Sequence, residues 1–363
     1  MTASSAGSVG VGSTDAASAG AVSTSPTQLP AASGSNVLPL PSASGPLSIF
    51  ADVVIKGAFS TAQAGLTAAE GPDGAVFVAG VATSPQIVWV VDGISPAAVA
   101  EHLAGPVTAL AADADNLYVG VGKSVYAYSR TTGALVHTWT QAALFGTVNQ
   151  LALAGNRLWG LYTAPDDGPP VAPAALVEID PSSNHPVRTV TGITGAFSIA
   201  AGSSGVYYVT KQSSQLVEQT NNGDTVSVPT HQSVDLQLSG PSAIQAVAVV
   251  GGQVVLQHDA GQGLDAVLNT YDAGSLAGPS APISFSAAEQ LVATPSGLFV
   301  IGNPDTGACS AGQQTCVRRF SLAGGNVGDP LALPDDTLAT DVTGPYPTVV
   351  LGAGSDVHVL RIG

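Results

Sequence analysis

The chain contains 363 residues, of which 45% are hydrophobic and only 9% are charged. Nine basic residues against 25 acidic residues give a formal net charge of −16. This charge disfavours a protein that binds nucleic acid or an anionic membrane, because both functions need clustered lysine and arginine. Two cysteines are too few for a zinc-finger scaffold or a disulfide-dense miniprotein.

The first 47 residues differ from the rest in composition. Ala, Ser, Gly, Thr and Pro make up 35 of these 47 residues, and Asp15 is the single charge. Such a segment buries too little apolar surface to offset its ordering entropy. We therefore expect a flexible tail at 1–47, acting as a stalk between an anchor and one folded domain at 48–363.

The same composition bears on localisation. No basic residue precedes Lys56, and no apolar stretch approaches the about 18 residues of a membrane span. A cytosolic protein is one interpretation. The stalk-like tail favours another, a secreted, periplasmic or cell-surface protein whose export signal has been removed.

A short apolar stretch recurs seven times at intervals of 41 to 49 residues. It begins at Leu66, Val107, Val148, Phe197, Ile244, Leu291 and Leu338. A turn and a second expected strand follow each time, at 76–78, 117–119, 158–160, 206–208, 253–255, 298–300 and 348–350. Third strands are expected at 88–90, 125–127, 176–178, 215–217, 268–270, 317–319 and 357–359, and helical periodicity is nearly absent.

Turn-rich hairpins at 131–133, 181–184 and 221–224 then lead to a fourth strand. Four strands in each of seven repeats predict an all-β, seven-bladed β-propeller with four-stranded antiparallel blades. The last repeat ends after its third strand, and the β-prone segment Ile49–Ile55 lies upstream of the first repeat. We predict that this N-terminal strand pairs with the C-terminal blade and closes the ring. Two β-sandwiches would explain the strands, but neither the period nor the unpaired ends.

Two segments resemble known propeller repeats. Tyr128–Trp139 resembles the outer hairpin of a quinoprotein-type repeat, and Leu176–Val190 resembles a YVTN-type repeat of bacterial surface propellers. The resemblance extends over roughly 48–363 at the level of repeats and implies the fold rather than an activity. It also implies that the loops between second and third strands and the connections between blades share one face, which usually binds.

Several loops of that expected face are long, at 163–173, 230–242, 258–265 and 303–315. Equivalent positions at the ends of three successive second strands carry polar side chains, which predicts a ligand-binding cluster. Its members are Lys211, His258, Asp259, Asn303 and Asp305, and loop 163–173 adds Asp166 and Asp167. The alternative is a solvated rim of loops.

The enzyme classes found on propellers match less well. Lactonase-type propellers hold a cation with oxygen ligands in the channel. The inner-strand positions here carry no carboxylate, being Thr67, Thr108, Asn149, Ser198, Gln245, Val292 and Ala339. Quinoprotein dehydrogenases need eight blades and a charged cofactor pocket. We therefore expect neither a metal nor a cofactor.

Cys309 and Cys316 are separated by small polar residues and predict a disulfide, which indicates an oxidising compartment. Closing this loop would contribute ~2.5 kcal/mol. The function predicted is an exported or surface-tethered monomer, a binding or scaffold module for a protein or glycan on the long-loop face. An extracellular hydrolase or lyase that uses carboxylates on that face is the alternative, followed by a purely structural envelope protein.

Overall fold

The computed structural model describes residues 47–57, 66–80, 87–92, 95–101, 103–164, 173–194, 196, 198–210, 215–229, 244–258, 266–279, 283–285, 288–294, 297–302, 316–322, 325–333, 339–343, 348–353 and 355–362. The expected tail lies outside these residues, apart from Leu47. That side chain is buried and packs with Leu333, Phe299 and Leu360. No helix long and apolar enough to cross a membrane occurs in the described part of the chain.

The described residues form 28 strands arranged in seven four-stranded antiparallel sheets. Blade 1 contains β2 (Leu66–Glu70), β3 (Val76–Gly80), β4 (Ile87–Asp92) and β5 (Ser95–Glu101). Blade 2 contains β6 (Val107–Ala112), β7 (Asn116–Val121), β8 (Ser124–Ser129) and β9 (Leu135–Thr140). Blade 3 contains β10 (Thr147–Ala154), β11 (Arg157–Thr163), β12 (Pro173–Ile179) and β13 (Pro186–Thr194).

The remaining blades repeat this order. Blade 4 contains β14 (Ile199–Ala201), β15 (Gly205–Thr210), β16 (Gln215–Thr220) and β17 (Thr225–Pro229). Blade 5 contains β18 (Ile244–Val250), β19 (Gln253–His258), β20 (Ala266–Asp272) and β21 (Ile283–Phe285). Blade 6 contains β22 (Ala288–Thr294), β23 (Gly297–Gly302), β24 (Cys316–Ser321) and β25 (Gly325–Ala332). Blade 7 contains β26 (Ala339–Thr343), β27 (Thr348–Ala353), β28 (Asp356–Ile362) and the N-terminal strand β1 (Ile49–Ile55).

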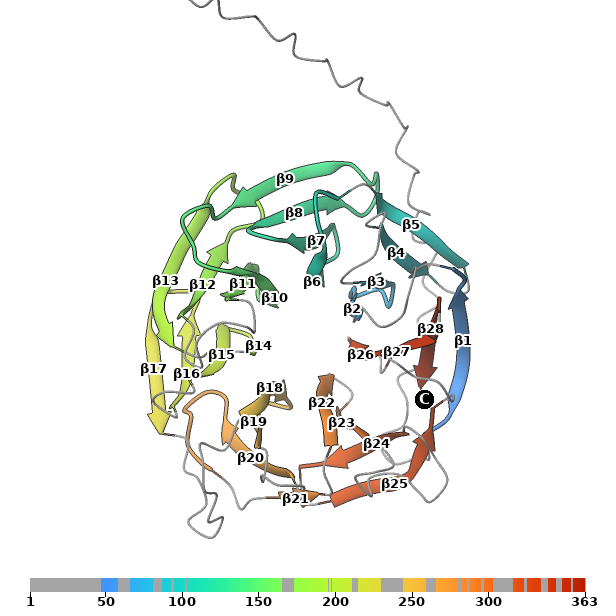
Figure 1. The fold of residues 1–363 in the computed structure, drawn as a ribbon. Coiled ribbons are helices and arrows are strands. Elements are labelled where there is room, and N and C mark those ends of the chain that lie inside the picture. The colour runs from blue at the N-terminus through green and yellow to red at the C-terminus, as the bar shows by residue number, and fades with distance from the viewer. Residues whose placement is uncertain are drawn as a thin grey trace, which may run out of the picture.

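The blades form a ring in which the first strand of each blade lies nearest the axis (Figure 1). The strand β1 runs along the outer edge of β28, with Val53 opposite Val359 and Ile55 opposite Val357. The predictions of a seven-bladed propeller and of ring closure by Ile49–Ile55 are therefore confirmed.

The hydrophobic core lies between neighbouring blades. Phe77 of blade 1 shares a cluster with Val107 and Leu117 of blade 2, and Tyr118 of blade 2 shares the next cluster with Tyr162 of blade 3. A middle strand therefore buries both of its faces, which explains why the second strands read as apolar runs without alternation. The outer strands β9 and β17 are mostly exposed.

Close packing of blades requires a small residue at Gly120. A Cβ there would lie 2.8 Å from Cγ1 of Val148 in blade 3. Blades 2 and 3 can approach this closely only because position 120 lacks a side chain.

A buried ion pair crosses the seam where the ring closes. Arg361 of β28 donates from Nη1 to Glu70 of β2 at 2.9 Å and to Thr348 at 2.8 Å, and from Nη2 to the carbonyl of Gly74. Arg361 is 4% and Glu70 is 9% exposed, so both charges are almost fully desolvated and satisfy each other. The last blade is thereby joined to the first.

Removing residues 1–55 should destabilise the ring strongly, whereas removing residues 1–46 should change the free energy of unfolding by less than about 0.5 kcal/mol. The longer deletion removes Val53 and Ile55 from the core and leaves β28 with an open edge. Thermal and denaturant unfolding of both truncations would measure this.

A pair of point variants makes the same test without truncation. Ile55→Ala should cost about 2–4 kcal/mol because the side chain is fully buried. Phe50→Ala on the same strand should be nearly neutral because Phe50 is half exposed. Equal effects of the two variants would contradict closure by β1.

Candidate functional site

Most of the ligand-binding cluster predicted from the sequence falls on residues outside the described ranges. These residues are Asp166, Asp167, Lys211, Asp259, Asn303 and Asp305. The backbone of His258 is described: it ends β19, opposite Ile244 of β18 and Val267 of β20. The cluster therefore stays a prediction.

The predicted disulfide is described at one end. Cys316 begins β24 opposite Gly302 and Ala332 and is fully buried. Cys309 is one of the residues that the structure does not describe. The pairing of the two cysteines likewise stays a prediction.

The connection between blades 2 and 3 presents an aromatic side chain to solvent. Phe145 lies in loop 141–146 and is 63% exposed, the largest exposure among the described bulky apolar residues. Its neighbour Leu144 packs into the core between the two blades. Loop 141–146 lies beside the turn between β7 and β8, since Gln141 donates its N–H to the carbonyl of Lys123. Phe145 therefore stands on the face that carries the second-to-third-strand loops.

Glycine fixes the end of this loop. Gly146 has a φ of +89°, and a Cβ there would lie 2.0 Å from the carbonyl oxygen of Thr163. Val148 donates its N–H to the carbonyl of Gly122, which fastens the loop to blade 2. Phe145 is thus held between a partly buried leucine and a glycine that no other residue can replace without a shift.

The opposite face, formed by the hairpin turns within each blade, carries polar contacts between blades. In blade 2, Arg130 follows β8 and its Nη2 contacts the carboxylate of Asp73 in blade 1 at 2.5 Å. Nη1 donates to the carbonyl of Asp113 at 2.6 Å, and the guanidinium lies over the Phe77 ring, 5.2 Å from its centroid. Burial raises the pKa of Asp73, but the hydrogen bond and charge of Arg130, together with backbone N–H groups, lower it by more, so the pKa lies below its usual value.

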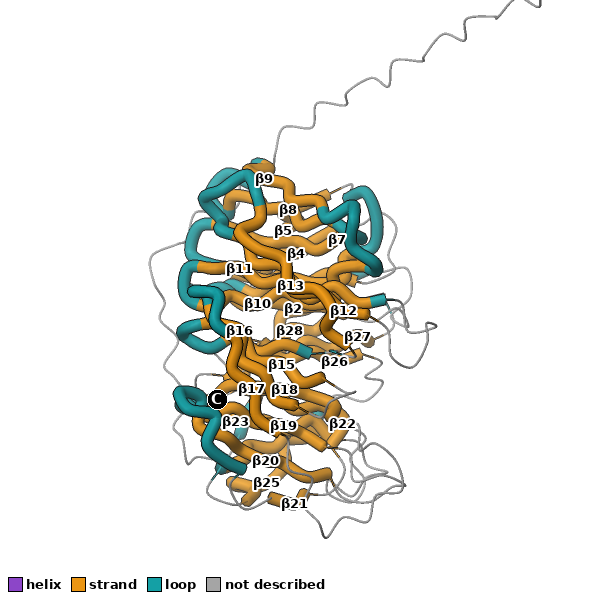
Figure 2. Tube along the Cα trace, turned by 90° about the vertical axis from the view of Figure 1, so that its left-hand side faces the viewer, coloured by secondary structure: helices purple, strands orange, loops and turns teal. Residues whose placement is uncertain are grey.

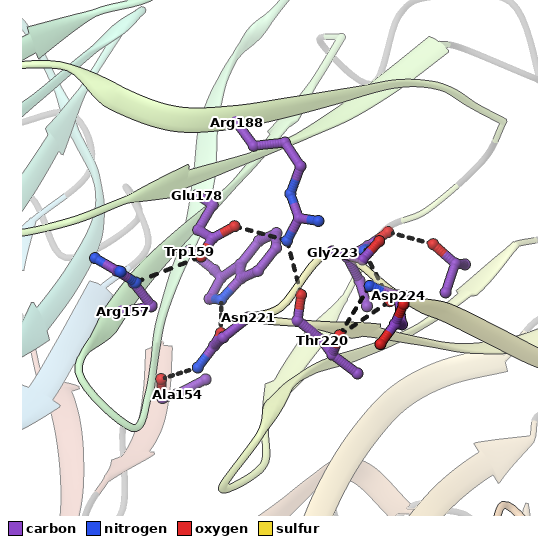
Figure 3. Close-up of polar contacts among 11 residues, drawn as sticks. Ala154, Arg157, Trp159, Glu178, Arg188, Thr220, Asn221, Gly223 and Asp224 are labelled. Carbon is purple, nitrogen blue, oxygen red and sulfur yellow. Dashed lines mark hydrogen bonds and ion pairs between the residues drawn. The ribbon is translucent and has the colours of Figure 1, made fainter.

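Blades 3 and 4 are joined at the same place by Asn221, as Figure 3 shows. Asn221 follows β16, accepts the indole N–H of Trp159 at 2.9 Å and donates to the carbonyl of Ala154 at 2.9 Å. In blade 5 the residue at this place is Ala273, whose carbonyl accepts the hydroxyl proton of Tyr207 from blade 4 at 2.6 Å. We call this place the junction position. In each blade it lies two residues after the third-strand residue that pairs with the first apolar residue of the second strand.

Strand register assigns the junction position to Arg130, Asn221 and Ala273, to Pro181 in blade 3, and to the apolar Leu322 and Ile362 in blades 6 and 7. The first three residues also donate their N–H groups to the first hairpin turn of their own blade, at Asp115, Ser204 and Gly252. Proline has no N–H to donate. Among the described residues Pro181 makes no hydrogen bond with blade 2, and the indole N–H of Trp139 in blade 2 donates instead to the carbonyl of Ser183 at 2.9 Å.

A groove of about 380 Å³ lies beside Pro181, between blades 2 and 3. Three hairpin turns enclose it, one from blade 2 and two from blade 3. Its lining consists of Asp113, Asp115, Asn116, Leu153, Gly155, Asn156, Asp180, Pro181 and Ser182. Its volume is near the lower end of the ~300–1,000 Å³ of ligand pockets.

The carboxylates of the groove differ in their partners. Asp113 accepts the hydroxyl proton of Tyr118 at 2.5 Å and the backbone N–H groups of Asp115 and Asn116. Asp180 accepts from the hydroxyl and N–H of Ser182 and pairs with Arg157, and these contacts lower its pKa to about 2. Neither Asp113 nor Asp115 forms an ion pair among the described residues.

A buried carboxylate lies behind the groove. Glu178 of β12 is fully buried and pairs with Arg188 at 2.6 Å and with Arg157 at 3.5 Å (Figure 3). Arg188 also donates to the carbonyl of Thr220 in blade 4 and lies over Trp159. These charges pair with one another and join blade 3 to blade 4, so they have a structural role.

The described residues contain no group of three His, Cys, Asp or Glu side chains that could hold a metal ion.

The sequence analysis missed both described candidates, the Phe145 loop and the groove. The signal for the first was an apolar Leu144–Phe145 pair inside a connection. The signal for the second was Pro181 in a position where other repeats carry Arg130 or Asn221.

Arg130→Ala should lower the free energy of unfolding by about 2 kcal/mol at pH 7, allowing for the partial exposure of Asp73. Because the pKa of Asp73 is lowered in the folded protein, the pair stabilises above its ordinary value of 3.8 and is lost as the pH falls below it. The difference between wild type and variant should therefore shrink from pH 5 toward pH 2 in urea unfolding. Lys123→Ala, which removes an exposed ammonium bonded to a carbonyl, should show no such trend. A constant difference would mean that packing on Phe77 dominates.

Mass spectrometry of a non-reduced digest should show Cys309 and Cys316 in one linked peptide. Reduction should separate the peptide and lower the melting temperature, because loop closure contributes ~2.5 kcal/mol. Two alkylatable thiols in protein from its native source would contradict the disulfide.

Comparisons with known proteins support the fold. No family model matches the chain, and no curated protein matches it. Among solved structures, BamB from Moraxella catarrhalis is similar at 12% identity and a TM-score of 0.53, covering 87% of this chain and 99% of that one. The WD40 β-propeller domain of Doa1 is similar at 13% identity and a TM-score of 0.55, covering 88% of this chain and 97% of that one. At these identities the likeness identifies the chain as a β-propeller and no more.

Proposed function

We propose that this protein is an exported binding or scaffold propeller that recognises a protein partner through the face carrying Phe145. The observation that carries the proposal is the exposure of Phe145 on a loop held by Leu144 and Gly146. Aromatic side chains dominate binding energy at protein interfaces, and a fixed one loses little entropy on binding. The loop lies beside blades whose further loops on this face are long in the sequence.

A protein partner fits this face better than a glycan or a charged ligand. The loop 141–146 contains no charged residue, and the neighbouring Lys123 is engaged with the carbonyl of Ala142. Uncharged, partly apolar surfaces with an aromatic centre are typical of protein interfaces. A glycan partner is the other outcome that the experiment below distinguishes.

Export and tethering form the second part of the proposal. The Ala, Ser, Gly, Thr and Pro-rich segment 1–46 has the composition of a flexible stalk, and the two cysteines suit an oxidising compartment. A net charge of −16 favours solubility as a monomer and a neutral or basic partner. The alternative of a hydrolase depends on carboxylates outside the described residues, and no described feature favours it.

Photocrosslinking tests the binding face directly. A benzoylphenylalanine at position 145 of the full chain should form one saturable adduct in an extract of the native source, and the adduct mass distinguishes a protein from a glycan. The same probe at Val226, 44% exposed on the outer strand β17, is the matched control and should give no saturable adduct.

Competition gives the second readout. Excess wild-type protein should abolish the adduct, whereas Phe145→Ala should compete at least about tenfold less well at unchanged melting temperature. Equal competition by the variant, or equal adducts at positions 145 and 226, would overturn the proposal.

A further inference from the structure

At the groove between blades 2 and 3 the junction position supplies no polar group, in contrast to three other described junctions. At three junctions the chain supplies the group that fills the space between two blades, a guanidinium from Arg130, an amide from Asn221 or a carbonyl from Ala273. Between blades 2 and 3 the junction residue is Pro181, and the groove is found there.

The walls of this groove resemble those of the junction where an arginine is bound. There, Arg130 lies between an aspartate in the first turn of blade 1 and a carbonyl in the first turn of blade 2, beside the aromatic ring of Phe77. In the groove, the first turn of blade 2 presents Asp113 and Asp115, and register places Tyr118 in blade 2 where blade 1 has Phe77. The carboxylates and the aromatic position of that junction therefore recur here without the arginine.

The charges of the groove favour a cation from outside. Asp180 is already paired with Arg157, whereas Asp113 and Asp115 have no cationic partner among the described residues. Burial, followed by the hydrogen bond to Asp113, raises the pKa of Tyr118, so its hydroxyl remains a proton donor to that carboxylate. The carboxylate of Asp113 is therefore held in place.

We propose that this groove receives an arginine side chain of a partner protein. A planar guanidinium can bond a carboxylate and a neighbouring carbonyl together, as Arg130 does one junction away, and a lysine ammonium cannot reproduce this fork. The site lies on the hairpin-turn face, opposite the Phe145 loop, and does not depend on the function proposed for that loop.

The test uses the full chain and the peptide acetyl-Gly-Arg-Gly-amide, titrated by ligand-observed NMR at physiological salt. The isosteric citrulline peptide, which lacks the charge, should bind at least about tenfold more weakly, and the lysine peptide should lie between them. Equal binding of the arginine and citrulline peptides, or no binding of either, would overturn the proposal.

Variants locate the binding. Asp115→Asn should weaken the arginine peptide about fivefold. Asp224→Asn, an exposed carboxylate in a hairpin turn of blade 4, is the matched control and should change binding less than about twofold. Pro181→Arg should restore an internal occupant and abolish binding of the peptide.

Either of two results would show a diffuse acidic surface instead of a site. One is equal weakening by Asp115→Asn and Asp224→Asn, and the other is wild-type affinity in a folded Pro181→Arg protein. Should Pro181→Arg fail to fold, the two asparagine variants decide the question alone, since both carboxylates are exposed and their loss leaves the strands untouched.

Discussion

The second strands of blades 1 to 4 are buried on both faces, and that constraint governs the rest of the structure. A blade with both faces apolar is covered only when a neighbour lies on each side, so an open row of blades would leave two faces in water. Closing the blades into a ring buries both of these exposed faces. The strand β1 and the buried Arg361–Glu70 pair form the seam at which this happens, joining the first strand of the chain to the last blade.

Several polar contacts between blades lie on the hairpin-turn face, while much of the interior of the junctions is apolar. Arg130, Asn221 and Tyr207 each reach across a junction near the turns, where aspartate side chains and backbone carbonyls are available. Aromatic rings at the start of the second strands, such as Phe77 and Trp159, provide the apolar base for these contacts. Burial of apolar side chains stabilises the packing of neighbouring blades, and the polar contacts determine the position of one blade relative to the next.

The two faces therefore offer different chemistry to a partner. The loop face presents Phe145 on a short, glycine-locked connection, which suits an apolar contact. The turn face presents a small acidic groove where Pro181 supplies no polar group of the kind that Arg130, Asn221 and Ala273 supply at three other junctions. A repeat protein can acquire a site in this way by losing an internal contact, because the surrounding repeats preserve the frame.

The sequence by itself determined the architecture, because a period of 41 to 49 residues, apolar second strands and an orphan N-terminal strand are all local patterns. It predicted Ile49–Ile55 as the closing strand, since a strand without a partner must find one. It did not predict Phe145 or the groove. The exposure of Phe145 depends on the fixing of Leu144 and Gly146 against other strands. The groove depends on which turn faces Pro181 across the junction. Contacts between repeats are set by register and packing in three dimensions, and only the tertiary structure decided them.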